Sequence, residues 1–228
     1  MAGVKQFDQN DVLDRAMAVF WERGYEATSI QDLLDAMGIN RGSLYATFGD
    51  KKRLFLAVLD HYADKVGDPL IAELAEPDPR RAIERMFAAL IRRTRDPSRP
   101  RGCLVTNTAL ECPGSGDDIS RTIAERLGQL ESAIYHMLHR AQAEGTLDRA
   151  HDCRALARFF VGVAQGINVV SKAMADPATL QDMVTVAMRV WDGPSPPEKG
   201  APAVGVKAQN QWPKKDAPRL SKSSRLAK

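Results

Sequence analysis

The stretch from Thr28 to Leu54 constrains the fold more than any other part of this 228-residue chain. Thr28 and Gln31 stand three residues apart, as the partners of a capping box do, and so predict a helix that starts at Thr28. Four apolar residues follow at helical spacing: Ile30, Leu33, Leu34 and Met37. Gly38 fits the position just past the end of such a helix, where a left-handed backbone is needed.

A second short helix is predicted directly after this turn. Asn40 suits its N-cap, and Leu44 and Phe48, four residues apart, would point inward together. Two helices around a tight turn form a helix-turn-helix, in which the start of the second helix meets base edges in the DNA major groove. We therefore expect DNA contacts from residues at the starts of these helices and on their exposed faces: Thr28, Ser29, Arg41, Gly42, Ser43, Tyr45, Thr47 and Lys51.

Individual roles follow from the side chains. Arg41 can pair its two-pronged guanidinium with O6 and N7 of a guanine, and Gly42 allows the backbone to approach the duplex closely. Lys51 follows Asp50, the expected cap of the next helix. A cation is unfavourable at a helix N-terminus, so its place there suggests a DNA phosphate as the compensating anion. The alternative is that Arg41 and Tyr45 are ordinary surface residues.

The run GINRGSLYATFGDKKRL, residues 38–54, resembles the DNA-binding signature of TetR-family transcriptional repressors. That signature has a Gly-x-Leu/Phe-Tyr-x-x-Phe core, then a Lys and a downstream Leu, and the resemblance covers residues 7–60. It implies an all-α fold of about nine helices. Residues 1–60 would form a three-helix helix-turn-helix DNA-binding domain, and residues 61–192 a helical ligand-binding and dimerisation domain. It also implies that Tyr45 and Lys51 contact phosphates.

The charge distribution separates a third segment. The chain carries a net charge of +3. Residues 193–228 hold eight Lys or Arg and two Asp or Glu, so the rest of the chain nets −3. We expect this proline-rich stretch to be a disordered basic tail, either adding weak DNA affinity or merely solvated. The helix capped by Asp50 is expected to end at Gly67-Asp68-Pro69, because glycine and proline break a helix.

The last two predicted helices are apolar on more than one side, and residues 155–170 contain a single charged residue, Arg158. Such helices must be covered on all sides. Internal packing is one reading, and a homodimer interface is the one we favour, as TetR-family dimers pair their last two helices in a four-helix bundle. The expected interface residues are Gly162, Gly166, Val184 and Met188.

The helical body also offers candidate sensing sites. Family members hollow the space between the middle helices for hydrophobic ligands, and the pool of lining residues is Met86, Phe87, Leu90, Asn107, Phe159, Phe160, Val163 and Asn168. Cys103 is a redox candidate, because a helix start and the nearby Arg99 and Arg101 would favour its thiolate. An intrachain disulfide to Cys112 would require the helix to rearrange. A zinc site at His136, His139 and the run 151–153 is weakly suggested, and the spacing matches no known motif.

The resemblance to the TetR family implies a ligand-responsive, homodimeric repressor, released from a pseudo-palindromic double-stranded operator by a small hydrophobic effector. The alternative is a repressor that senses electrophiles or redox state through Cys103. No paired carboxylates, nucleophile elbow or phosphate loop indicates an enzyme, and we expect no cofactor and no metal. No apolar run approaches the roughly 20 residues of a membrane span, and residues 1–10 lack the core of a signal peptide. A cytoplasmic protein without a membrane partner is therefore expected.

Overall fold

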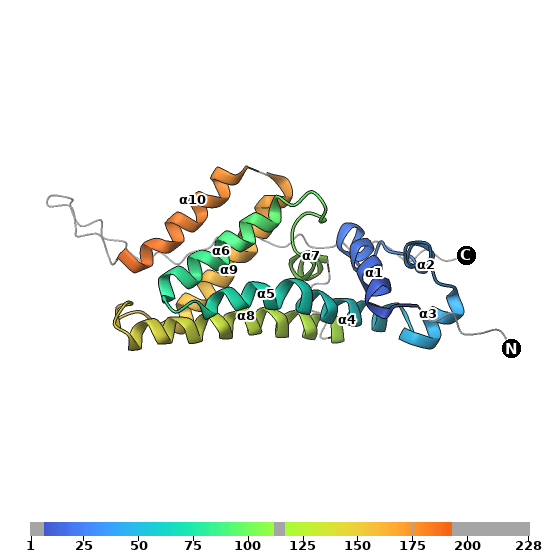
Figure 1. Ribbon diagram of the computed structural model, residues 1–228, viewed down its shortest axis with the longest axis horizontal. Helices are drawn as coiled ribbons and strands as arrows, with labels where there is room; N and C mark the ends of the chain where they lie inside the picture. Colours follow the sequence, from blue (N-terminus) through green and yellow to red (C-terminus); the bar gives the residue numbers. More distant parts are fainter. Residues whose placement is uncertain (1–6, 112–116, 175, 193–228) are drawn as a thin grey trace, which may run out of the picture. The chain divides into compact units, whose positions relative to one another are not determined.

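The computed structural model describes residues 7–111, 117–174 and 176–192. Every regular element within these ranges is a helix, which confirms the all-α prediction (Figure 1). In chain order the elements are α1 Gln9–Arg23, α2 Ile30–Met37, α3 Arg41–Phe48, α4 Lys51–Tyr62, the π-helix η1 Ala63–Gly67, α5 Asp68–Ala72, the 3-10 turn η2 Glu73–Ala75, α6 Pro79–Thr94, α7 Leu104–Glu111, α8 Asp118–Ala143, α9 Cys153–Ala173, α10 Pro177–Met188 and the 3-10 turn η3 Arg189–Asp192. Cys112 and the tail at 193–228 lie outside the described residues.

The start of α2 differs by one residue from the prediction. Ser29, not Thr28, is the N-cap: its hydroxyl accepts from the Asp32 amide at 3.1 Å, and the Asp32 carboxylate accepts from the Ser29 amide at 2.9 Å. The capping box is therefore Ser29 with Asp32 rather than Thr28 with Gln31. Gly38 ends the helix with φ 68°, in the left-handed conformation expected of it.

The chain does not leave the helix at Gly67-Asp68-Pro69, as the sequence predicted. The five-residue π-helix η1 continues α4, and α5 follows it directly. Pro69 is tolerated because it stands in the first turn of α5, where its missing N–H costs no internal hydrogen bond. The boundary expected at residue 60 thus falls inside a helical segment, and the division into domains stays a prediction.

Two clusters of buried apolar side chains hold the helices together. The N-terminal core is built on α1–α4 and also takes Leu104 and Val105 from α7 and Ile119 and Ile123 from α8. Its centre is aromatic: the ring of Phe55 lies 4.8 Å from those of Phe20 and Tyr25. Because α7 and α8 complete this core, the helix-turn-helix and the helical body share buried surface.

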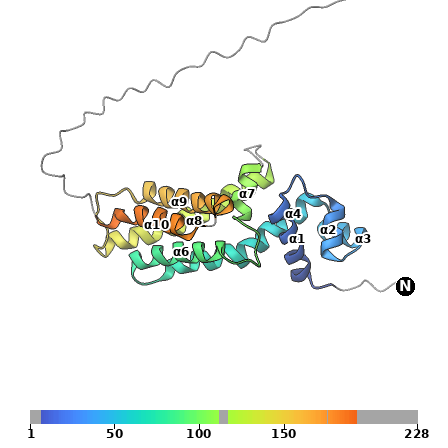
Figure 2. The ribbon, with the colours of Figure 1, turned by 90° about the horizontal axis from the view of Figure 1, so that it is seen from above.

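The second cluster, the C-terminal core, joins α6, α8, α9 and α10. Helix α9 packs against all three of the others (Figure 2). Helix α9 is long and apolar enough to cross a membrane by length and composition alone, which the sequence did not lead us to expect; a helix in a protein core passes the same test. Phe160 is fully buried and Phe159 is 50% exposed, so the apolar surface of α9 extends well beyond the face that packs on this core.

Candidate nucleic-acid interface

Helix α3 is held at both ends and presents its remaining surface to solvent. The Asn40 side chain accepts from the Ser43 amide at 2.8 Å, which caps the helix as predicted. Leu44 and Phe48 are buried in the N-terminal core, 0% and 7% exposed, and fix the orientation of the helix. An exposed face therefore remains at the start of α3, the part of a recognition helix that meets base edges.

The predicted DNA-binding residues divide into accessible and inaccessible ones. Arg41, Gly42 and Thr47 are exposed, Ser43 is half-buried and Tyr45 is 43% exposed. Thr28 is only 1% exposed, and its hydroxyl donates to the Gly24 carbonyl at 2.6 Å. The prediction that the Thr28 side chain contacts DNA is thus wrong, because this side chain is buried and its hydroxyl is hydrogen-bonded within the α1–α2 turn.

Two lysines at the start of α4 differ in their surroundings. Lys51 lies over the ring of Tyr25, 4.5 Å from its centroid, and donates to the Glu26 carbonyl at 3.4 Å. Lys52 instead pairs with Asp118 of α8 at 2.7 Å, and this hydrogen bond raises the pKa of Lys52. Lys51 is therefore the better placed of the two for a phosphate.

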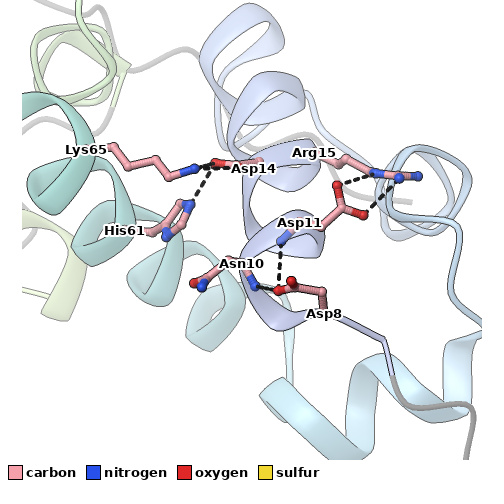
Figure 3. A network of polar contacts seen from close by, with 7 residues as sticks. All are labelled: Asp8, Asn10, Asp11, Asp14, Arg15, His61 and Lys65. Atoms are coloured by element: carbon pink, nitrogen blue, oxygen red, sulfur yellow. Dashed lines mark hydrogen bonds and ion pairs between the residues drawn. The ribbon is translucent and has the colours of Figure 1, made fainter.

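A polar cluster ties α1 to the end of α4 (Figure 3). Asp14 accepts from His61 Nε2 at 2.7 Å and from Lys65 of η1. Partial burial alone would raise the pKa of Asp14, but hydrogen bonds from Lys65 and His61 lower it by more. This arrangement joins α1 of the helix-turn-helix to α4 and η1, and no pattern in the sequence indicates it.

The Asp14→Asn substitution is expected to lower the free energy of unfolding at pH 7 by about 1 kcal/mol, the upper end for a partly exposed ion pair. The lowered pKa of Asp14 makes its contribution fully present above the unfolded pKa of about 3.9 and lost as pH falls through the folded pKa. Chemical denaturation of both proteins from pH 7 to pH 2.5 measures this. Asp11→Asn, in an exposed pair with Arg15, serves as the control. A deficit that persists unchanged at the lowest pH would contradict the assignment.

A cavity of about 640 Å³, including its open mouth, lies beneath the helix-turn-helix, that is, between the N-terminal core and the C-terminal core. Its walls are mostly apolar and come from seven helical elements, α4, η1, α5, α6, α7, α8 and α9. The lining residues are Tyr62, Ala63, Gly67, Asp68, Leu70, Ile71, Leu90, Arg93, Cys103, Val105, Arg126, Leu127, Gln129, Leu130, Ala164, Gln165 and Asn168. Ligand pockets in proteins pair apolar walls with a few polar groups. The cavity thus has the lining of a small-molecule site.

Only part of the predicted ligand-binding pool lines this cavity. Leu90 and Asn168 do. Met86, Phe87 and Phe160 do not line it, because they are fully buried in the C-terminal core, and their part in a ligand site stays a prediction. Phe159 faces solvent, while Val163 packs on that core and Asn107 lines a separate surface pocket beside α1.

Several lining residues escaped the sequence analysis, above all Tyr62, Arg126 and Gln165. Arg126 had a signal, since it is a charged residue beside Leu127 and Leu130; its Nη2 pairs with Asp60 at 2.5 Å. Gln165 had one too, as a polar residue within an apolar run, and its side-chain oxygen accepts from the Thr106 hydroxyl. Tyr62 had none, because an aromatic residue at helical spacing normally packs in a core.

Cys103 lines the cavity and precedes α7 directly. The Tyr62 hydroxyl donates to its sulfur at 3.2 Å, and burial, with the nearby Cys103 sulfur, raises the pKa of Tyr62 well above its usual value. Cys153, by contrast, is buried at the start of α9, and burial raises the pKa of its thiol. In the described part of the chain no three His, Cys, Asp or Glu residues gather as metal ligands would.

The predicted interface residues on α9 and α10 do not share one surface. Val184 and Met188 are 5% and 6% exposed and belong to the C-terminal core, so they offer little surface to a partner, and their place in an interface stays a prediction. Gly166 lets α10 approach, because an added Cβ there would lie 3.2 Å from Met183 Cε. Gly162 alone borders open space. The exposed apolar side chains of these two helices are instead Phe159, Val169 and Val186.

Comparison with known proteins agrees with this architecture. Residues 12–58 match the family model of bacterial regulatory proteins, tetR family, and residues 79–187 match that of the tetracyclin repressor-like C-terminal domain. The uncharacterized HTH-type transcriptional regulator YezE of Bacillus subtilis (strain 168) is 38% identical, over 82% of this chain and 98% of its own. The HTH-type transcriptional repressor ComR of Escherichia coli (strain K12) is 33% identical, over 82% and 90%.

Among solved structures, a cysteine mutant of the TetR family transcriptional regulator CifR, complexed with 26bp double-strand operator DNA, superposes with a TM-score of 0.77. It is 32% identical, and the match covers 82% of this chain and 98% of that one. Two family models that together span most of the described residues, and relatives aligned over nearly their whole length, agree with the capped recognition helix and the helical body. This chain belongs to the TetR family of DNA-binding transcriptional regulators.

Proposed function

We propose that this protein is a homodimeric repressor that a small hydrophobic ligand, bound in the cavity beneath the helix-turn-helix, releases from its operator. The observation that carries the proposal is the position of that cavity. Tyr62 and Ala63, at the junction of α4 and η1, form part of its wall, and the start of α4 carries Lys51. A ligand that favours a different placement of this helical segment lowers the DNA affinity. The change in DNA-binding free energy is limited by the difference between the free energies with which the ligand binds the DNA-binding state and the released state.

The DNA-binding part of the proposal rests on the exposed start of α3. Arg41 and Tyr45 are presented there by a helix whose cap and buried side chains fix its orientation. CifR, which this chain resembles over its helix-turn-helix and body, was solved on operator DNA. We assign base contacts to Arg41 and phosphate contacts to Tyr45 and Lys51, with Ser29, Gly42, Ser43 and Thr47 bordering them.

The dimer rests on exposed apolar surface. Phe159 and Val169 of α9 and Val186 of α10 are 50%, 45% and 59% exposed, on helices that otherwise build the C-terminal core. A second copy related by a two-fold axis would cover the same surface on both protomers. It would also place two recognition helices on successive half-sites of a pseudo-palindrome.

The Leu127→Trp substitution tests the ligand site. Leu127 is half-buried at the cavity, so an indole there would occupy ligand space without replacing a core residue. We expect operator affinity to stay within about threefold of wild type. We expect that about ten times more organic extract of the native host cells is needed to release the variant from its operator than to release the wild type. This factor corresponds to about 1.4 kcal/mol of lost ligand binding. Fluorescence anisotropy of labelled DNA from the flank of its own gene measures both quantities. Equal release of both proteins would contradict the assignment of the cavity.

A second candidate function is thiol-based sensing, favoured by the presence of Cys103 in the cavity wall next to the Tyr62 hydroxyl. In that case hydrogen peroxide or N-ethylmaleimide releases the wild-type protein from its operator and leaves a Cys103→Ser variant bound. Serine keeps an acceptor for Tyr62, so basal DNA binding is retained. Cys153→Ser, at the buried cysteine, is the control. Release of the Cys103→Ser variant would eliminate this candidate.

A further inference from the structure

The carboxylate of Glu111, at the end of α7, reaches across to the turn between α1 and α2. Its Oε2 accepts from the Tyr25 amide at 2.9 Å and its Oε1 from the Glu26 amide at 2.6 Å. Glu111 lies more than 80 residues away in sequence from the turn that it holds. One side chain of the helical body thus satisfies two successive backbone donors of the helix-turn-helix.

The turn is shaped to receive this carboxylate. Gly24 has φ +86°, and a Cβ on it would lie 2.6 Å from Glu111 Oε2, so only glycine permits both the backbone conformation and the close approach. Helix α7 itself gives no reason for an acidic residue at this point, since a negative charge at a helix C-terminus is unfavourable. The two amide donors offset that cost.

The same turn supports Lys51. The Lys51 ammonium lies 4.5 Å from the ring centroid of Tyr25 and donates to the carbonyl of Glu26, the two residues whose amides Glu111 binds. The position of Lys51, to which we assign a phosphate contact, therefore depends on the position of the turn.

The other end of α7 lies at the cavity. Cys103 and Val105 line it, and Thr106 donates its hydroxyl to Gln165 while accepting from the Asn168 side chain at 3.4 Å. Helix α7 has eight residues and is therefore about 12 Å long, so it spans from the cavity to Glu111. Helix α7 contacts both α1 and α9, and both views of the molecule place it between them (Figures 1 and 2).

We propose that Glu111 is a positioning residue for DNA binding, which sets the α1–α2 turn and with it Lys51. We further propose that α7 links this contact to the cavity, a second step that rests on the proposed ligand site. The first step requires no ligand and stands on the contacts of Glu111 alone.

Operator affinity of the full-length protein without any ligand tests the first step. Glu111→Ala is expected to weaken operator binding roughly 3- to 30-fold, the range of substitutions that act on a site through its supports. Glu111→Gln, which keeps one acceptor oxygen, should fall between Ala and wild type. The matched control is Glu125→Gln, which removes the same charge from an exposed position on α8. Removal of a negative charge close to DNA would by itself strengthen binding, so the sign of the effect separates positioning from simple electrostatics.

Hydrogen exchange supplies a readout that a general loss of stability would not give. The Tyr25 and Glu26 amides are expected to exchange faster in Glu111→Ala while amides in the middle of α8 and α9 keep their wild-type rates. Operator affinity equal to or higher than that of wild type would overturn the first step. The first step would also be overturned if the Tyr25 and Glu26 amides kept their protection in Glu111→Ala, or if exchange became uniformly faster throughout the chain.

A double-mutant cycle tests the link to the cavity. Thr106→Val removes the hydroxyl that joins α7 to Gln165 and Asn168. We expect it to change operator affinity in the wild-type background and to have little further effect once Glu111 is alanine, because the link is then already broken. If the fold-changes of the two single variants multiply in the double variant, the second step is overturned and the first remains intact. If Leu127→Trp leaves ligand release unchanged while Glu111→Ala weakens operator binding, the ligand site is discarded and the role of Glu111 is kept.

Discussion

The Val186→Glu substitution is expected to convert the proposed dimer into a monomer and to weaken operator binding roughly 100-fold, the scale of avidity lost when two linked sites act separately. Val186 is 59% exposed on α10, and the neighbouring helix α9 also exposes Phe159 and Val169. A two-fold interface would bury the new carboxylate on both protomers, and each uncompensated buried charge costs about 3–5 kcal/mol. Sedimentation equilibrium gives the mass, and anisotropy with a full operator gives the affinity.

Thr185→Glu is the matched control for this result. Thr185 is the exposed neighbour of Val186, but it borders a groove between α10 and α6 together with Arg80. The same charge at this place should leave the dimer and its operator affinity unchanged. A Val186→Glu protein that keeps the mass of a dimer would show that the proposed interface lies elsewhere.

The Arg41→Ala substitution is expected to weaken binding to the operator roughly 10- to 100-fold, as loss of one bidentate base contact of about 1–3 kcal/mol would. Arg41 is the first residue of α3 and is exposed. Binding to unrelated DNA should change much less, so the ratio of the two affinities falls. Competition between operator and random duplex measures this ratio.

Lys51→Ala provides the comparison within the same surface. A phosphate contact carries no sequence information, so its loss should lower both affinities alike and reduce the salt dependence of binding by about one counterion. Arg149→Ala, in the exposed loop before α9, controls for the loss of an arginine charge far along the chain. If Arg41→Ala lowers specific and unspecific binding equally, Arg41 contacts the backbone and our assignment is wrong.

The sequence predicted the recognition helix well because the forces there are local. Asn40 caps the residues that follow it, and Leu44 and Phe48 are one helical turn apart. It missed the cap of α2 by one residue because Thr28 and Ser29 both offer a hydroxyl three residues before a polar side chain. The choice depends on a contact outside the helix, the hydrogen bond from Thr28 to the Gly24 carbonyl.

The cavity could not be predicted in the same way. Apolar periodicity shows that Met86 and Phe87 face inward, and it carries no information on whether the space there is filled. Those two side chains fill it, and the hollow lies nearer the helix-turn-helix, beside Tyr62 and Gln165. Its location follows from contacts between helices distant in sequence, and so does the bond from Glu111 to the α1–α2 turn.

The π-helix η1 has a consequence for the walls of the cavity. A π turn holds one residue more than an α turn, so every residue after it is rotated by about 100° from where an unbroken α-helix would place it. Tyr62 precedes η1, while Leu70 and Ile71 follow it, and all three line the cavity. If the same residues continued as an unbroken α-helix, Leu70 and Ile71 would turn away from the space that they now enclose, whereas removal of one residue between Ala63 and Gly67 would close the π turn and keep their direction.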